Sequence, residues 1–179
     1  MIFTDFQHKV SKQDYSKKPT IDGVKLVDLQ CMIDEGGSFC EVARLGGSHE
    51  VKDHFPSFYV KQINWSLVEP GAIKAGHIHL NQDDIWFVPP TEKLLVGLMD
   101  VRESSTSRGV KMRFVLGAGK ARLLYIPKGV AHGCANLSVR PMHMVYFVNQ
   151  YWSSDATLSD EYRIDYKEFG DNFWEIQKG

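Results

Sequence analysis

Turns that contain glycine or proline divide the chain between residues 59 and 148 into short apolar or alternating runs. The clearest run, 59–67, places Gln62, Asn64 and Ser66 on one face of an extended strand, with apolar side chains at the positions between them. The run 93–101 is nearly all apolar, which is typical of a strand buried on both faces. Because little of the chain has helical periodicity, this punctuation predicts an all-β sandwich or barrel.

The same reading gives the positions of the strands. They are expected over residues 24–29, 59–67, 85–88, 93–101, 110–116, 121–126 and 142–148, with a further strand around residue 77. Residues 39–45 are expected to form either a strand or a strand and a short turn. Residues 46–56 are expected to form a loop. All 179 residues are assigned to one domain, in which 1–22 is a polar N-terminal arm and 153–179 is a tail with a short helix, packed on the sheet.

Composition excludes several classes of partner. The net charge is −1, so no surface for nucleic acid is expected, and no apolar run approaches the roughly 18 residues of a membrane span. The chain has three cysteines, an odd number, and its first residues do not resemble a secretory signal. We therefore expect free thiols and a cytoplasmic protein.

Two histidines stand at positions 77 and 79. In a strand this spacing puts both imidazoles on one face, while Ile78 points the other way. Histidine titrates near neutral pH and ligates metals, so the pair can transfer protons or bind a cation. So short a pattern is equally typical of a surface or core pair with satisfied hydrogen bonds.

A second histidine segment, Pro127 to Asn136, raises the case for function. Together the two segments resemble the motifs of the cupin superfamily, which implies a double-stranded β-helix, or jelly roll. The matching residues of the first motif are Gly71, His77, His79 and Asp84, and those of the second are Pro127, Gly129, His132 and Asn136.

More of the chain resembles one branch of these proteins, the 3,5-epimerases of nucleotide-linked 4-keto-6-deoxy sugars typified by dTDP-4-dehydrorhamnose 3,5-epimerase. The similar segments are 34–41, 60–66, 74–77, 95–102 and 126–133, together with Tyr146 and Tyr151. The resemblance implies an isomerase that inverts C3, C5 or both through an enolate, in the biosynthesis of cell-surface polysaccharide such as O-antigen or of deoxysugars. It also implies a nucleotide-sugar substrate, no cofactor, and a homodimer in which an N-terminal strand crosses to the partner.

The resemblance also implies roles for individual residues. His77 is expected to be the catalytic base, Tyr146 the acid on the opposite face of the sugar, and Asp171 the carboxylate that orients the base, with Asp165 as second choice. The expected substrate contacts are Gln62, Asn64, Ser66, Lys74, His79, His132 and Glu41.

The chain departs from that family pattern at three places. Gly36 and Lys74 stand where the family has arginines, and Lys74 keeps the charge without the two-pronged geometry of a guanidinium. The family's catalytic lysine has no counterpart near residues 83–87. Stabilisation of the enolate must therefore come from another group, and Lys74, His79 and His132 are the candidates.

Two alternatives stay open at this point. The first is a metal-dependent cupin, a dioxygenase or an isomerase, in which three imidazoles and a carboxylate hold the ion. Its ligands would be His77, His79, Asp84 and His132. The second is a catalytically inactive cupin that binds a sugar.

Overall fold

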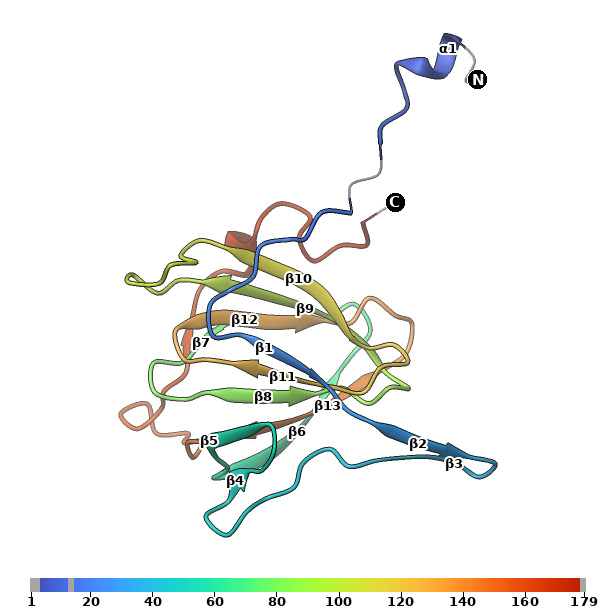
Figure 1. Ribbon diagram of the computed structural model, residues 1–179. Helices are drawn as coiled ribbons and strands as arrows, with labels where there is room; N and C mark the ends of the chain where they lie inside the picture. The colour runs from blue at the N-terminus through green and yellow to red at the C-terminus, as the bar shows by residue number, and fades with distance from the viewer. Residues whose placement is uncertain (1–3, 13–14, 178–179) are drawn as a thin grey trace.

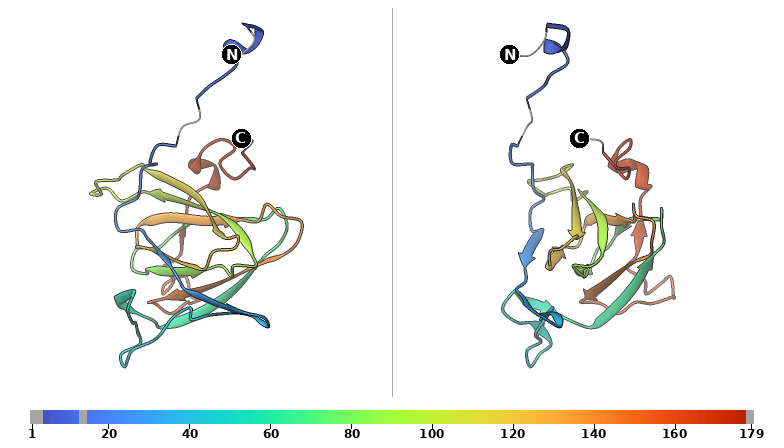
Figure 2. Two further views of the ribbon diagram at one scale, coloured as in Figure 1. Left: turned by 45° about the vertical axis from the view of Figure 1, so that its right-hand side comes forward. Right: turned by 90° about the vertical axis from the view of Figure 1, so that its right-hand side faces the viewer.

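The computed structural model describes residues 4–12 and 15–177, which form a rolled pair of antiparallel sheets (Figures 1 and 2). The first sheet has the order β1 (Lys25–Asp28), β11 (Arg122–Ile126), β8 (Asp84–Phe87), β13 (Met142–Val148) and β6 (Gln62–Val68). The second has the order β10 (Lys111–Gly117), β9 (Lys93–Asp100), β12 (Val130–Ala135), β7 (Ile73–Ile78) and β14 (Tyr162–Arg163). Apart from the consecutive pair β9 and β10, neighbours in each sheet are not consecutive in sequence, which is typical of a jelly roll. The predicted all-β jelly roll is confirmed.

The main hydrophobic core lies between the two sheets. Val68 and Leu124 come from the first sheet and Val96 and Leu98 from the second, and all four side chains are fully buried. In β9 every residue after Lys93 is buried, as its nearly unbroken apolar sequence predicts. Burial of such side chains from water is the main source of stability in a sheet pair of this kind.

Two short hairpins lie outside the main sheets. Of the two alternatives for residues 39–45, a strand throughout is wrong, since β3 (Gly37–Cys40) ends at Cys40 and pairs with β2 (Cys31–Asp34). The expected loop 46–56 contains β4 (Glu50–Val51) and the start of β5 (Phe55–Tyr59). Each hairpin is a separate two-stranded sheet. Buried and exposed side chains therefore do not alternate along β2 and β3 as they would in a strand packed on the core.

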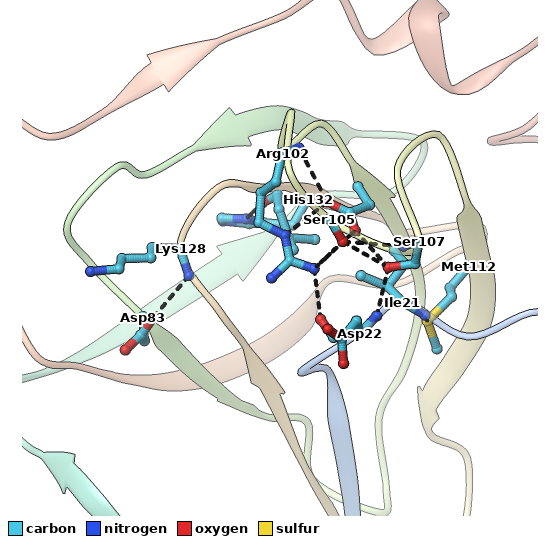
Figure 3. A network of polar contacts seen from close by, with 11 residues as sticks. Ile21, Asp22, Asp83, Arg102, Ser105, Ser107, Met112, Lys128 and His132 are labelled. Carbon is cyan, nitrogen blue, oxygen red and sulfur yellow. Dashed lines mark hydrogen bonds and ion pairs between the residues drawn. The ribbon is translucent and has the colours of Figure 1, made fainter.

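The N-terminal arm carries one helical turn, α1 (Thr4–Gln7), and extends away from the barrel (Figure 1). Residues 1–3 and 13–14 of the predicted arm lie outside the described residues. The arm joins the barrel at Asp22, whose backbone N–H donates to Ser107 Oγ and whose carbonyl oxygen accepts from Arg102 (Figure 3). Ser107 and Arg102 in turn bond to the buried carboxylate of Asp100.

The C-terminal tail returns to the second sheet. Its short helix is the 3-10 turn η1 (Tyr166–Phe169), with Asp165 as N-cap accepting from the backbone N–H of Lys167. Phe169 and Trp174 are buried against residues of β9 and β12. In the described part of the chain, no helix has the length and apolar character needed to span a membrane.

Candidate active site

A cavity of about 270 Å³ opens between the two sheets. Strands β6, β8 and β13 supply one wall, β7 and β12 supply the other, and the segment from Tyr151 to Arg163 borders the mouth. Cavities of this kind, with a few convergent polar groups, are where barrels and sandwiches bind small molecules.

Most of the residues predicted from the sequence meet in this cavity. His77, His79 and His132 line it with Tyr146. Three more of the residues expected to touch substrate also line it: Asn64, Ser66 and Lys74. Gln62 does not line the cavity, but it bonds to two residues that do. Its side-chain amide N–H donates to Asn64 Oδ1 at 2.6 Å, and its Oε1 accepts from the backbone N–H of Trp152.

Two predicted residues lie elsewhere. Glu41 pairs with the exposed guanidinium of Arg44 at 2.8 Å and does not border the cavity. Asp171 lies in a separate hollow formed by the C-terminal turns, beside Asn172 and Gly170. The prediction that Asp171 orients His77 was therefore wrong for this structure, and so is the second choice, because Asp165 caps η1.

The carboxylate that meets His77 is that of Glu161. Oε1 of Glu161 lies 3.1 Å from Nδ1 of His77. Because a carboxylate accepts, the His77 Nδ1 atom carries the proton and its Nε2 atom keeps a lone pair. Glu161 is also hydrogen-bonded to Arg163, so its position is held from two sides.

The local backbone explains why Glu161 reaches His77. Tyr162 and Arg163 of β14 pair with Ile78 and His77 of β7. Gly76 has φ of +84°, and a Cβ atom there would lie 2.0 Å from the carbonyl oxygen of Ile164. Glycine at position 76 thus allows the tail to approach β7 closely enough to form this pair.

The electrostatics of the pair favour a neutral imidazole. Burial lowers the pKa of His77, as does the charge of Arg163, while Glu161 acts in the opposite direction. Burial raises the pKa of Glu161, but the hydrogen bond from Arg163 and the charge of His77 leave it lower overall. At neutral pH the site holds a neutral imidazole, with its proton on Nδ1, beside an ionised carboxylate.

His79 and His132 form a second histidine pair in the same cavity. His132 is fully enclosed, and burial lowers its pKa to about 4, so it is neutral at neutral pH. Its Nδ1 lies 2.9 Å from the carbonyl oxygen of Val130, and Nδ1 of His79 lies 2.9 Å from that of Asp160. Since carbonyl oxygens only accept, both Nδ1 atoms carry protons, and Nε2 of the neutral His132 ring carries a lone pair.

Two of the cavity histidines, together with the carboxylate of Asp84, are suited to holding a cation. Among the described residues, His79, Asp84 and His132 each offer a ligand atom within 4.8 Å of the others. Asp84 is held by donors from Gln82 and Trp86, which is the supporting arrangement that metal ligands need. A divalent ion would fit this set of two nitrogens and one oxygen. His77, the fourth ligand predicted for a metal cupin, is not part of the group and faces Glu161 instead.

Tyr146 borders the cavity from the other sheet. It lies on β13, opposite Asn64 of β6, and packs partly against the core between the sheets. Burial raises the pKa of its hydroxyl, against the effect of a hydrogen bond with Ser66. The phenol is therefore protonated at neutral pH and able to donate.

Several cavity residues were missed by the sequence analysis. They include Gln82, Trp86, Cys134, Trp152, Asp160, Glu161 and Arg163. The only signal for Glu161 is the alternation Glu161–Tyr162–Arg163, which places two charged side chains on one face of a very short strand. Asp160 gave no signal, because its role depends on a turn that brings it to the backbone N–H groups of Asn81 and Gln82.

Comparison with known proteins agrees with this geometry. A family model described as dTDP-4-dehydrorhamnose 3,5-epimerase matches residues 18–169. The chain belongs to this family of isomerases. It is 38% identical over 148 residues to the spore coat polysaccharide biosynthesis protein SpsL of Bacillus subtilis, a match that covers 83% of this chain and 91% of the relative.

Two further similar proteins extend the comparison. The Haloferax volcanii protein named "Probable low-salt glycan biosynthesis epimerase Agl13" is 32% identical over 83% of this chain and 90% of its own length. The crystal structure of the dTDP-6-deoxy-D-glucose-3,5-epimerase of Legionella pneumophila, in complex with dTDP-4-keto-L-rhamnose, superposes with a TM-score of 0.71. That match has 22% identity and covers 90% of this chain and 83% of the other, and it shows the shared jelly-roll fold.

Proposed function

We propose that this chain epimerises a nucleotide-linked 4-keto-6-deoxy sugar at C3, C5 or both, with His77 as base and Tyr146 as acid. The observation that carries the proposal is that these two side chains border one cavity from different sheets. A sugar ring held between them would meet a base on one face and a proton donor on the other.

The first step is removal of a proton from carbon. A ketone at C4 acidifies the C–H bonds at C3 and C5, and Nε2 of His77 accepts the proton because its lone pair is free. The electron pair of the broken C–H bond moves into the enolate. Glu161 then stabilises the imidazolium through its contact with Nδ1.

The second step returns a proton to the opposite face. Tyr146 delivers the proton of its hydroxyl to the enolate carbon. Solvent then reprotonates the phenolate and takes up the proton that His77 removed from the sugar. The raised pKa of Tyr146 keeps the hydroxyl loaded before each turnover.

The enolate oxygen needs a positive neighbour, and the geometry narrows the candidates. His132 cannot donate from Nε2 while neutral, because its single N–H is used by the carbonyl oxygen of Val130. Arg163 is paired with Glu161. Lys74 is the cavity cation that remains, with its Nζ held only by the carbonyl oxygen of Leu67 at 3.3 Å, and we assign it this role.

The substrate class follows from the family. The Legionella neighbour was crystallised with dTDP-4-keto-L-rhamnose, and the relatives are named for polysaccharide or glycan biosynthesis. A dTDP-linked 4-keto-6-deoxyhexose, used in the synthesis of a surface polysaccharide, is therefore the proposed substrate. We also propose a cytoplasmic homodimer, as the family resemblance implies.

The test is NMR of dTDP-4-keto-6-deoxy-D-glucose incubated with the protein in heavy water. The expected result is deuterium at C3, C5 or both, with inversion at the labelled carbon. Binding of the nucleotide sugar without deuterium uptake would replace the epimerase with an inactive sugar-binding protein. A metal-dependent reaction is favoured only if the labelling requires an added divalent ion, which the group of His79, Asp84 and His132 would hold.

A further inference from the structure

Two of the three cysteines face each other on the β2–β3 hairpin. Cys31 and Cys40 are direct cross-strand partners, at the end of the hairpin that joins the barrel. The hairpin itself projects from the barrel (Figure 1), and none of its residues lines the candidate active site. Nine positions separate the two cysteines in sequence, and only the tight turn at Glu35 and Gly36 brings them together.

The geometry of the pair suits a covalent bond. Direct partners in an antiparallel ladder have Cα atoms about 4.5–5.5 Å apart, which lies within the roughly 4.4–6.8 Å that a disulfide spans. The two thiols lie close enough that Cys31 contributes to raising the pKa of Cys40. Both side chains are half-buried, so a small reagent can reach them, whereas Cys134 is buried.

The surroundings indicate what such a bond would fix. Cys31 and Cys40 pack against the hydrophobic cluster that contains Phe55 and Phe147, while Met32, Ile33 and Phe39 farther along the hairpin are exposed. The cysteine pair is therefore the point at which a projecting apolar hairpin is anchored to the barrel. A covalent link there would hold both of its strands on the cluster.

We propose that Cys31 and Cys40 are a dithiol that closes to an intramolecular disulfide when the protein meets a small-molecule disulfide. The Cys31 thiolate attacks one sulfur of the oxidant RSSR, forming a mixed disulfide and releasing RS⁻. The Cys40 sulfur then attacks Cys31 Sγ, loses its proton to solvent and displaces a second RS⁻. Two electrons pass from the protein to the oxidant, and two RSH molecules result once both anions take up protons.

Burial, together with the neighbouring Cys31, raises the pKa of Cys40 to about 11. The exchange balances equally with Cys40 attacking first and Cys31 resolving, and both orders end in the same disulfide.

The experiment titrates the whole protein with mixtures of oxidised and reduced glutathione, folded in buffer and unfolded in urea. Mass spectrometry after quenching by alkylation follows a loss of about 2 Da and the peptide that joins Cys31 to Cys40. The quantity compared is the ratio of the oxidised glutathione concentration to the square of the reduced glutathione concentration at which half of the protein is oxidised. We expect this ratio to be at least about tenfold lower for the folded protein than for the protein in urea, because the hairpin holds the two thiols together. Cys134 should stay unmodified when folded.

Two outcomes would overturn the proposal. One is equal or easier closure in urea, which would show that the hairpin does not favour the bond. The other is folded protein in which Cys31 and Cys40 carry separate glutathione adducts. The variant Cys40→Ser supplies the control, since it should stop at a single adduct on Cys31.

Discussion

Nδ1 of His77 lies 3.1 Å from Oε1 of Glu161, although 84 positions separate the two residues in sequence. The contact fixes which nitrogen of the imidazole is free, and it sets the charge that the ring can carry after it takes a proton. The tail of the chain thereby becomes part of the site, because β14 pairs with β7 at this point.

Replacing Glu161 with glutamine tests this contact. Glu161→Gln keeps the size of the side chain but removes the charge, so we expect kcat to fall by about 10- to 100-fold, a part of the roughly 10²–10⁴ that a general base supplies. Glu161 raises the pKa of His77, so its loss lowers that pKa further. The base must be unprotonated, and the acidic limb of the kcat/KM profile should therefore move to lower pH.

Asp171→Asn is the matched control for Glu161→Gln. Asp171 is the carboxylate expected from sequence, but it lies in a separate hollow. We expect its kcat and pH profile to match wild type. An Asp171→Asn defect as large as that of Glu161→Gln, with a shifted acidic limb, would assign the orienting role to Asp171 after all.

Removing the imidazole tests the base. In His77→Ala we expect deuterium uptake at the sugar carbons to fall by about 10²–10⁴-fold, because Nδ1 of His77 is hydrogen-bonded to a carboxylate, whereas Nδ1 of His79 and of His132 bonds to a backbone carbonyl oxygen. His143→Ala removes a histidine that stacks on Trp65 outside the cavity, and it should leave exchange unchanged. Undiminished exchange in His77→Ala would exclude His77 as the base.

Tyr146→Phe separates the two half-reactions. His77 can still remove a proton and return deuterium to the same face, so exchange in heavy water should continue while inversion falls by about 10²-fold or more. In wild type, activity should decline at high pH only above the usual tyrosine range, because burial raises the pKa of Tyr146 and the acid loses its proton later. Equal loss of exchange and inversion in the variant would argue against this division of labour.

The residues that sequence could predict are those whose position follows from local alternation. His77 and His79 reach the cavity because β7 and the residue after it keep the alternating pattern, and Tyr146 does so on β13. Glu161 could not be predicted in this way, since β14 has two residues and takes its place only by pairing with a distant strand. Cys31 and Cys40 show the same limit, because their contact depends on the register of one hairpin.

Exhaustive chelation tests whether the cation-binding geometry is used. The two proton transfers assigned to His77 and Tyr146 need no metal, so we expect activity after dialysis against EDTA to stay within about twofold of the untreated enzyme. Loss of activity that a divalent ion restores, but not in His79→Ala, would show that His79, Asp84 and His132 hold a required metal.

Asp100 offers a test of the fold that is independent of catalysis. Its carboxylate is 1% exposed and accepts from Arg102 Nε at 2.8 Å and from Ser107 Oγ at 2.6 Å. The hydrogen bond from Arg102, against the effect of burial, holds the pKa of Asp100 well below its usual value. In Asp100→Asn these donors face an amide without charge, so we expect a loss of about 2–4 kcal/mol in the free energy of unfolding and a Tm lower by roughly 5–15 °C.

The loss of stability in Asp100→Asn should depend on pH. Because the folded pKa of Asp100 is depressed, its contribution is fully present above the unfolded value of about 3.9 and disappears as pH falls through the folded pKa. The difference in stability between wild type and Asp100→Asn, measured by urea unfolding, should therefore be constant from pH 7 to about 5 and shrink below about 4.

Arg108→Ala is the control for Asp100→Asn. It removes an exposed ion pair with Glu103 and should cost less than about 1 kcal/mol at any pH. A difference for Asp100→Asn as small as that control would mean that the buried network does not anchor the arm at Asp22.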